Sequence, residues 1–165
     1  MSATQTVFGS LASYQKGGVQ VVDADPKHYV FSNVFEVASK SKPYERVAVA
    51  INLKYVIEAI RAEGTSPWFA ASHDESAVVM DGEVEVHFIQ PDQPLVPESK
   101  EGAVKLSGPP SGKNMGWVKC GRGHMALLPK GSAYQFRSAQ PGVLMVQSIK
   151  GENTVEKWAE ICQTK

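Results

Sequence analysis

Residues 75–88 of the chain, ESAVVMDGEVEVHF, decide the fold. Asp81 and Gly82 in the middle of this stretch are a strong signal for a two-residue turn, because a type I′ turn needs positive φ at both central positions. The turn predicts a hairpin in which Met80 pairs with Glu83 and side chains alternate between two faces. One face then carries an apolar set with a single carboxylate: Glu75, Ala77, Val79, Val84, Val86 and Phe88. The opposite face carries Ser76, Val78, Met80, Glu83, Glu85 and His87.

The apolar face must point into the protein, so the carboxylate of Glu75 is predicted to be buried. A buried carboxylate is costly unless it is paired, hydrogen-bonded or bound to a metal, and desolvation alone would raise its pKa. Two interpretations stay open. Glu75 is a structural acid satisfied by the backbone or by tyrosine hydroxyls, or it lines a functional cavity.

Short strand-like runs separated by Gly and Pro turns fill most of the remaining sequence. The expected strands cover residues 19–22, 28–37, 46–51, 115–120, 124–128, 133–137 and 143–149. Apolar residues at helical spacing predict a helix over residues 53–62, capped by Asn52 and ended by Gly64, and a closing helix over residues 153–163. This pattern predicts an all-β sandwich or barrel with a few peripheral helices.

The chain length of 165 residues suits a single domain over residues 1–165. Within it, residues 1–18 are small and polar and are expected to form an N-terminal arm. Residues 90–114 hold half of the ten prolines and predict an insertion loop. Connections this long are usually functional or disordered.

Charge and cysteine content exclude several classes of protein. Seventeen basic and seventeen acidic residues balance to zero, which gives no long-range attraction to nucleic acid or an anionic membrane. Cys120 and Cys162 fit no zinc-binding pattern. No apolar run approaches the ~20 residues of a membrane-spanning helix, and the N-terminal sequence lacks the pattern of a secretory signal. A reducing cytoplasm is the simplest expectation.

The spacing around Glu75 resembles the cupin family. The first cupin motif ends in a glutamate, six residues and a glycine, which Glu75 and Gly82 reproduce. The second motif is a glycine, five residues, Pro-x-Gly, two residues and a histidine. Gly123 and residues 129–131 (PKG) reproduce it up to the histidine. The resemblance implies a cupin-type β-barrel, or jelly roll.

Most of the cupin metal ligands are missing. Counted back from Glu75, the two histidines of the first motif fall on Trp68 and Ala70, or one residue later, within the run WFAA. The histidine of the second motif falls on Tyr134. Because three of the four usual ligands are replaced, the resemblance implies that this chain holds no metal.

The wider sequence resembles the small (alpha) subunit of the two-subunit hydroquinone 1,2-dioxygenases. The likeness rests on the degenerate cupin motifs, residues 64–69 (GTSPWF), the Pro-rich insertion and the expected C-terminal helix with Trp158. It implies a larger cupin-containing subunit that binds Fe(II), in a heterotetramer with two of each chain. It also implies no catalytic residue in this chain, and an aromatic substrate bound beside Trp68, with Tyr134 and Glu75 nearby. Trp117 is the second choice for the substrate-contacting tryptophan.

Two other interpretations remain. The chain could be a homodimeric cupin that binds or senses a small aromatic ligand near Glu75 and Tyr134. It could also be a stand-alone cupin metalloenzyme that uses Glu75 with His73 and His124. His87 faces outward in the predicted register, and His28 is remote in sequence.

Overall fold

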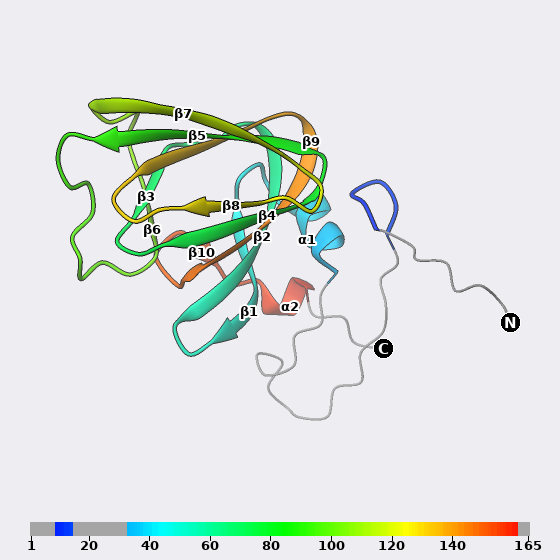
Figure 1. Cartoon of the computed structure of the whole chain (residues 1–165). Helices are drawn as coiled ribbons and strands as arrows, with labels where there is room; N and C mark the ends of the chain where they lie inside the picture. Colours follow the sequence, from blue (N-terminus) through cyan, green and yellow to red (C-terminus); the bar gives the residue numbers. More distant parts are fainter. Residues whose placement is uncertain (1–8, 15–32, 162–165) are drawn as a thin grey trace, which may run out of the picture.

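Ten strands of the described chain form one curled sheet, which confirms the expected all-β barrel class (Figure 1). The structure is a computed structural model that describes residues 9–14 and 33–161. Its strands are β1 (Arg46–Asn52), β2 (Tyr55–Thr65), β3 (Phe69–Ala71), β4 (Glu75–Asp81), β5 (Glu83–Pro91), β6 (Ala103–Lys105), β7 (Gly112–Gly121), β8 (Met125–Leu128), β9 (Ala133–Ile149) and β10 (Thr154–Val155). Two short helices, α1 (Val34–Lys40) and α2 (Trp158–Ile161), lie outside the sheet.

The longest strand, β9, organises the sheet. Its C-terminal half pairs with β2 on one side and β4 on the other. Its N-terminal half pairs with β5 and, at its start, with β3. The expected strands 133–137 and 143–149 are therefore two halves of one continuous strand.

The predicted hairpin at Asp81 and Gly82 is wrong. β4 pairs with β8 and β9, whereas β5 pairs with β7 and β9, so Met80 does not pair with Glu83. Gly82 has φ 76°, but Asp81 is not among the residues with positive φ, and a type I′ turn needs both. The chain bends here alongside β9 instead of reversing.

The predicted faces of this stretch are nevertheless confirmed. Ala77, Val79, Val84 and Val86 are each at most 2% exposed and pack in the main core. The residues between them on the opposite face are partly or fully exposed. The buried positions change from odd before the bend to even after it, because the pairing with β9 shifts register between Val79 and Asp81. This irregularity changes the inward parity as a two-residue turn would, so the predicted face is correct although the pairing is not.

The predicted helix over residues 53–62 is also wrong, because this segment lies mostly in β2. Asn52 ends β1 and pairs with Tyr55 across a tight turn rather than capping a helix. Both faces of β2 are buried: Ile60 packs in the main core, and Ala59 packs in a second cluster on the other side. Burial on two faces removes the alternation that marks a strand, and the apolar spacing then resembles a helix.

Helix α1 replaces the end of the expected strand 28–37. Asn33 caps it, since its side-chain oxygen accepts hydrogen bonds from the backbone N–H groups of Phe35 and Glu36. The remainder of that expected strand, and the expected strand 19–22, lie outside the described residues. The closing helix starts later than predicted, because Thr154 and Val155 form β10 against β1 and α2 begins at Trp158. The last two residues of the predicted helix, 162 and 163, lie outside the described residues.

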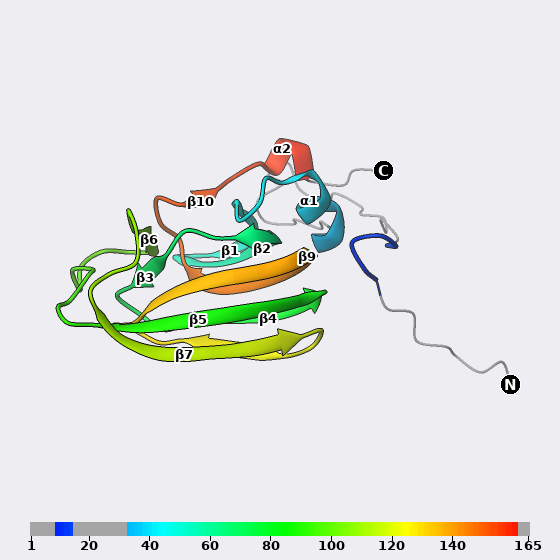
Figure 2. The same cartoon turned by 90° about the horizontal axis from the view of Figure 1, so that it is seen from above.

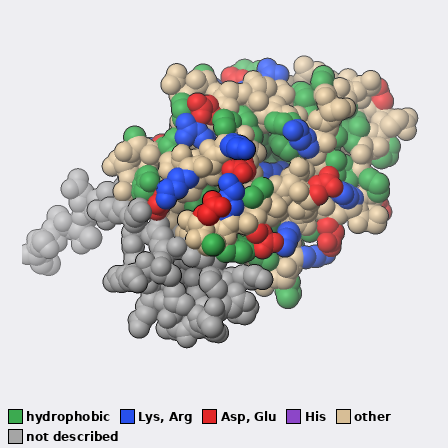
Figure 3. All heavy atoms as spheres, turned by 180° about the vertical axis from the view of Figure 1, so that it is seen from behind, with side chains coloured by type: hydrophobic (Ala, Val, Ile, Leu, Met, Phe, Trp, Pro, Cys, Tyr) green, Lys and Arg blue, Asp and Glu red, His purple; other side chains and the backbone are tan. Residues whose placement is uncertain are grey.

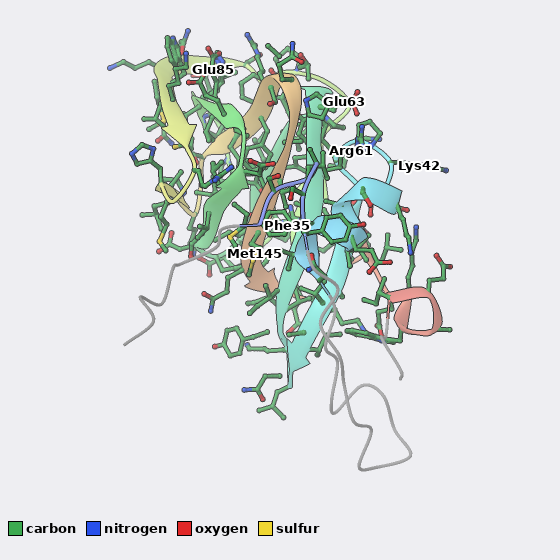
Figure 4. All side chains as sticks on the ribbon, turned by 90° about the vertical axis from the view of Figure 1, so that its right-hand side faces the viewer. Phe35, Lys42, Arg61, Glu63, Glu85 and Met145 are labelled. Atoms are coloured by element: carbon green, nitrogen blue, oxygen red, sulfur yellow. The ribbon has the colours of Figure 1, made fainter. Side chains whose placement is uncertain are left out.

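Both helices lie on the side of the sheet formed by β1 and β2 (Figure 2). Val37 of α1 and Ile161 of α2 pack there with Val47, Val49 and Ala59. The described part of the expected arm lies next to α1, where Gly9 contacts the ring of Phe35 (Figure 4). The arm is also tied to the bend, because the N–H of Leu11 donates to Asp81 Oδ2 at 2.7 Å.

The Pro-rich segment 90–114 contains more regular structure than an insertion loop. Its ends extend β5 and β7, and β6 within it pairs with β3.

On the face of the molecule shown in Figure 3, cationic and anionic side chains are interspersed rather than gathered by sign. None of the helices in the described part of the chain is long and apolar enough to cross a membrane.

We predict that Gly142→Ala destabilises the sheet at the bend. A Cβ on Gly142 would lie 2.7 Å from the carbonyl oxygen of Asp81, so backbone must shift, and we expect a cost of about 2–4 kcal/mol. Gly123→Ala is the control, because its φ of 83° is strained but its Cβ meets open space. The control should cost only about 1–2 kcal/mol. Denaturant unfolding measures both, and a larger loss in Gly123→Ala would contradict the account.

Candidate functional site

A buried arginine, Arg46 at the start of β1, lies at the centre of the barrel interior and is 4% exposed. Its Nε lies 2.5 Å from Glu58 Oε2, and its Nη2 lies 2.8 Å from Glu75 Oε1. Its Nη1 donates to the hydroxyl oxygen of Tyr134 at 3.0 Å. The Tyr134 hydroxyl in turn donates to Glu75 Oε2 at 2.5 Å. We call Arg46, Glu58, Glu75 and Tyr134 the Arg46 cluster.

Strands distant in sequence bring the cluster together. Arg46 and Glu58 come from the hairpin of β1 and β2, Glu75 opens β4, and Tyr134 lies near the start of β9. The second oxygen of Glu58 accepts a hydrogen bond from Thr154 Oγ1 of β10 at 2.7 Å. All of the cluster side chains are therefore held by more than one partner.

The electrostatics of the cluster favour its charged form. Burial on its own would raise the pKa of the Glu75 carboxyl. The positive charge of Arg46 and hydrogen bonds from Ser148 and Tyr134 outweigh burial and hold that pKa below its ordinary value. Burial raises the pKa of Tyr134 well above its ordinary value, so the phenol stays neutral. Glu75 therefore favours its carboxylate form, paired with the guanidinium of Arg46.

The interior does not fit a metal ion of the kind that cupins with a full ligand set bind. Phe69 is buried against Tyr134, with ring centroids 5.8 Å apart, and Ala71 lies two residues further along the same strand. The guanidinium carbon of Arg46 lies 5.6 Å from the centroid of the Phe69 ring. A guanidinium donates hydrogen bonds only and cannot ligate a cation. Phenyl, methyl, phenol and guanidinium groups thus stand where imidazoles and a metal would be needed.

The histidines considered as substitute ligands are engaged elsewhere. His73 Nε2 accepts from the backbone N–H of Ile149 at 3.2 Å and lies 3.1 Å from Ser148 Oγ. His124 is exposed in the turn before β8, where its Nδ1 accepts from the N–H of Gly121. His87 lies on the outer face with Glu85, as predicted. Within residues 9–14 and 33–161, no group of three or more His, Cys, Asp or Glu side chains could hold a metal ion.

The three tryptophans lie apart from the Arg46 cluster. Trp68 is half-buried in the segment just before β3, where its backbone carbonyl accepts from the N–H of Leu106. Trp117 on β7 is 54% exposed and stacks on His87. Trp158 lies on α2, where its ring N–H donates to Glu156. The structure therefore brings Glu75 and Tyr134 together, whereas Trp68 is not part of the Arg46 cluster.

A cavity of about 350 Å³ lies outside the barrel interior. It is lined by the end of β3, by residues 90–96 and Glu98, and by the turn at Lys130–Ser132. None of Glu75, Tyr134 and Trp68 lines it. The residues predicted from the sequence as a site therefore do not share this cavity.

Sequence reasoning missed Arg46 and Glu58, which complete the cluster. The signal was present, since each is a charged residue inside an otherwise apolar strand-like run, RVAVAI and YVIEAI. A charge at a buried strand position requires an opposite charge. The incorrect helix over residues 53–62 hid this, because a helix would have allowed Glu58 to face solvent.

Comparisons with solved structures identify close relatives over the whole chain. A chain of the hydroquinone 1,2-dioxygenase PnpCD, in complex with Cd2+ and 4-hydroxybenzonitrile, is 54% identical with a TM-score of 0.90 over 98% of each chain. A chain of the hydroquinone 1,2-dioxygenase of Sphingomonas sp. TTNP3, with 4-hydroxybenzoate bound, is 53% identical with a TM-score of 0.92 over 99% of each chain. No protein-family model and no curated protein matches the chain.

A longer chain shares the fold alone. A chain of PnpCD in complex with Fe3+ is 14% identical with a TM-score of 0.59, and the match covers 87% of this chain but 40% of that one. The PnpCD structures thus contain both a chain of this length and a longer chain with a region of the same fold.

We predict that Tyr134→Phe destabilises the protein by about 1–3 kcal/mol. The substitution keeps the ring but removes the hydroxyl that donates to Glu75 and accepts from Arg46, so buried polar groups lose a partner. Tyr55→Phe is the control, because Tyr55 is 52% exposed, and its change should stay within about 0.5 kcal/mol. Equal unfolding free energies for the two variants would contradict the structural role of the hydroxyl.

We also predict that Glu75 contributes to the loss of stability in acid. Its pKa is lowered on folding, so its contribution is fully present above its ordinary value of 4.5 and is lost as the pH falls below it. Glu75→Gln should therefore lower stability near neutral pH and flatten the acid limb of a stability–pH profile. The limb should persist in part, because Glu45 and Asp81 also have lowered pKa values. Parallel profiles for the variant and the wild type would contradict this assignment.

Proposed function

The chain belongs to the hydroquinone 1,2-dioxygenase family, and on that basis we propose that it is the small, metal-free subunit of a ring-cleaving dioxygenase. The carrying observation is the identity of more than half of the residues to relatives that match the chain from end to end. The proposed reaction is cleavage of hydroquinone by O2 next to a hydroxyl group, giving 4-hydroxymuconic semialdehyde.

The proposed partner is a longer subunit that holds the Fe(II). The Arg46 cluster supports the assignment of the iron to the longer subunit, because the guanidinium of Arg46 already supplies the positive charge in the interior of this chain. The longer chain of PnpCD, which has a region of this fold and was solved with Fe3+, supports it as well. When bound in the larger subunit, the iron would supply the activation of O2 and of the phenol.

The proposed role of this chain in the site is to form one wall of the substrate pocket. An aromatic substrate needs a flat apolar surface and few placed hydrogen-bond donors. Trp68 offers both, and its side chain is only half-buried within this chain. Glu75 and Tyr134 are buried, and Tyr134 packs on Phe69, the residue next to Trp68, so we propose that they support the pocket wall from inside.

We propose a cytoplasmic heterotetramer with two copies of each chain. The balanced charge of the small subunit supports association, because little repulsion opposes contact with a partner. The alternatives are less well supported. A sensor ligand beside Glu75 and Tyr134 would need groups that already bond to Arg46, and a stand-alone metalloenzyme would need His124 at the cluster.

We predict that the isolated chain does not cleave hydroquinone and that activity requires the larger subunit. In the reconstituted complex, Trp68→Ala should lower kcat/KM about 10–100-fold, because it removes the aromatic wall without touching the Arg46 cluster. Trp158→Ala is the matched control, and Trp117→Ala tests the second choice. Native mass spectrometry should find the same assembly in all three variants. Unchanged kinetics in Trp68→Ala would remove this residue from the site.

A further inference from the structure

We propose that the guanidinium of Arg46 occupies a buried cation-binding site formed by Glu58, Glu75 and Tyr134. In this position it prevents divalent metal ions from binding to this subunit. The site itself stands on the geometry of the cluster. Its consequence for the enzyme, that iron is loaded only into the larger subunit, rests on the proposed function.

Each of the two carboxylates also has a partner other than Arg46. The oxygen of Glu58 that does not face the arginine is held by Thr154 Oγ1 at 2.7 Å. The corresponding oxygen of Glu75 is held by the Tyr134 hydroxyl at 2.5 Å. Each carboxylate thus has one oxygen fixed by a neutral donor and one directed at the guanidinium. Removal of the guanidinium would leave both inner oxygens and the phenol oxygen facing one space.

That space would require another positive charge. Glu58 and Glu75 are each 1% exposed, so neither carboxylate can be solvated where it lies. Two buried carboxylates without a cation must take up protons, admit water or bind an ion. Oxygen ligands of this kind suit hard divalent cations such as Mn2+. The guanidinium therefore occupies the space into which these oxygen donors point, and in its absence a divalent ion with water as its remaining ligands would neutralise the two carboxylates.

The guanidinium is well suited to this role. It remains charged at every physiological pH, and its planar fork can address several acceptors at once. Here it uses Nε for Glu58, Nη2 for Glu75 and Nη1 for Tyr134. Phe69 closes the site on another side, with its ring 5.6 Å from the guanidinium carbon.

The test is metal uptake by the full-length Arg46→Ala variant. After incubation with Mn2+ and gel filtration, elemental analysis should find about one Mn2+ per chain in Arg46→Ala and none in the wild type. Saturating Mn2+ should raise the Tm of Arg46→Ala by about 5–10 °C and leave the wild-type Tm unchanged. Millimolar guanidinium should give a smaller rise, because it refills the same space. Absence of both uptake and rescue overturns the proposal.

Three further variants separate this site from other causes. Arg61→Ala is the matched control, because Arg61 forms a surface pair with Glu63 at 2.6 Å on the outside of β2 (Figure 4). It should take up no Mn2+. Arg46→Lys should also stay free of metal, since an ammonium still fills the site. Arg46→Ala/Glu75→Gln should lose uptake, and retention of Mn2+ in this double variant would overturn the proposal.

If Arg46→Ala folds poorly, a refolding measurement replaces the metal-uptake test. Refolding from denaturant that succeeds with Mn2+ and fails without it supports the site, whereas failure in both conditions with normal folding of Arg46→Lys overturns it. Assembly with the larger subunit is measured separately on the wild-type chains. Failure to assemble would count against the proposed function, and metal uptake by Arg46→Ala would still be informative about the site.

Discussion

The pairing of Arg46 with Glu58 and Glu75 is the interaction on which the rest of this barrel depends. Opposite charges at this depth attract strongly, but the desolvation of each ion nearly cancels the gain. The cluster is therefore weak evidence for high stability. Its effect is specificity, because any arrangement of β1, β2 and β4 that separates these residues leaves a buried charge without a partner. Loss of one member of such a pair typically costs about 3–5 kcal/mol.

The same pairing explains how a metal-binding frame can persist without a metal. In a barrel of this kind a cation at the centre holds side chains from several strands in one place. Here the guanidinium supplies that charge from within the chain, and Tyr134 and Phe69 fill the volume of the missing ligands. The fold keeps a charged, cross-linked centre, while redox chemistry is left to a neighbouring subunit in the proposed enzyme.

Sequence patterns predicted the features that depend on local alternation of side chains. They failed for the features that depend on pairing with strands distant in the sequence. The buried face of residues 75–88 was correct, because the register shift at the bend changes the inward parity as the predicted turn would. The turn at Asp81 was not, because its outcome depends on β9, which lies more than fifty residues away. The same limit applies to the site. The contact of Glu75 with Tyr134 followed from motif spacing, whereas Arg46 could be placed only by knowing that β1 and β2 pair.

The continuity of β9 has a consequence for how the protein is made. This strand pairs with β2, β3, β4 and β5, and it lies near the C-terminal end of the chain. During synthesis, the earlier strands leave the ribosome before the strand that joins them exists. Non-local pairings of this kind form slowly, and unpaired strand edges attract other chains. The newborn polypeptide thus passes through a period in which its apolar strands need protection, and early association with a partner or a chaperone would provide it.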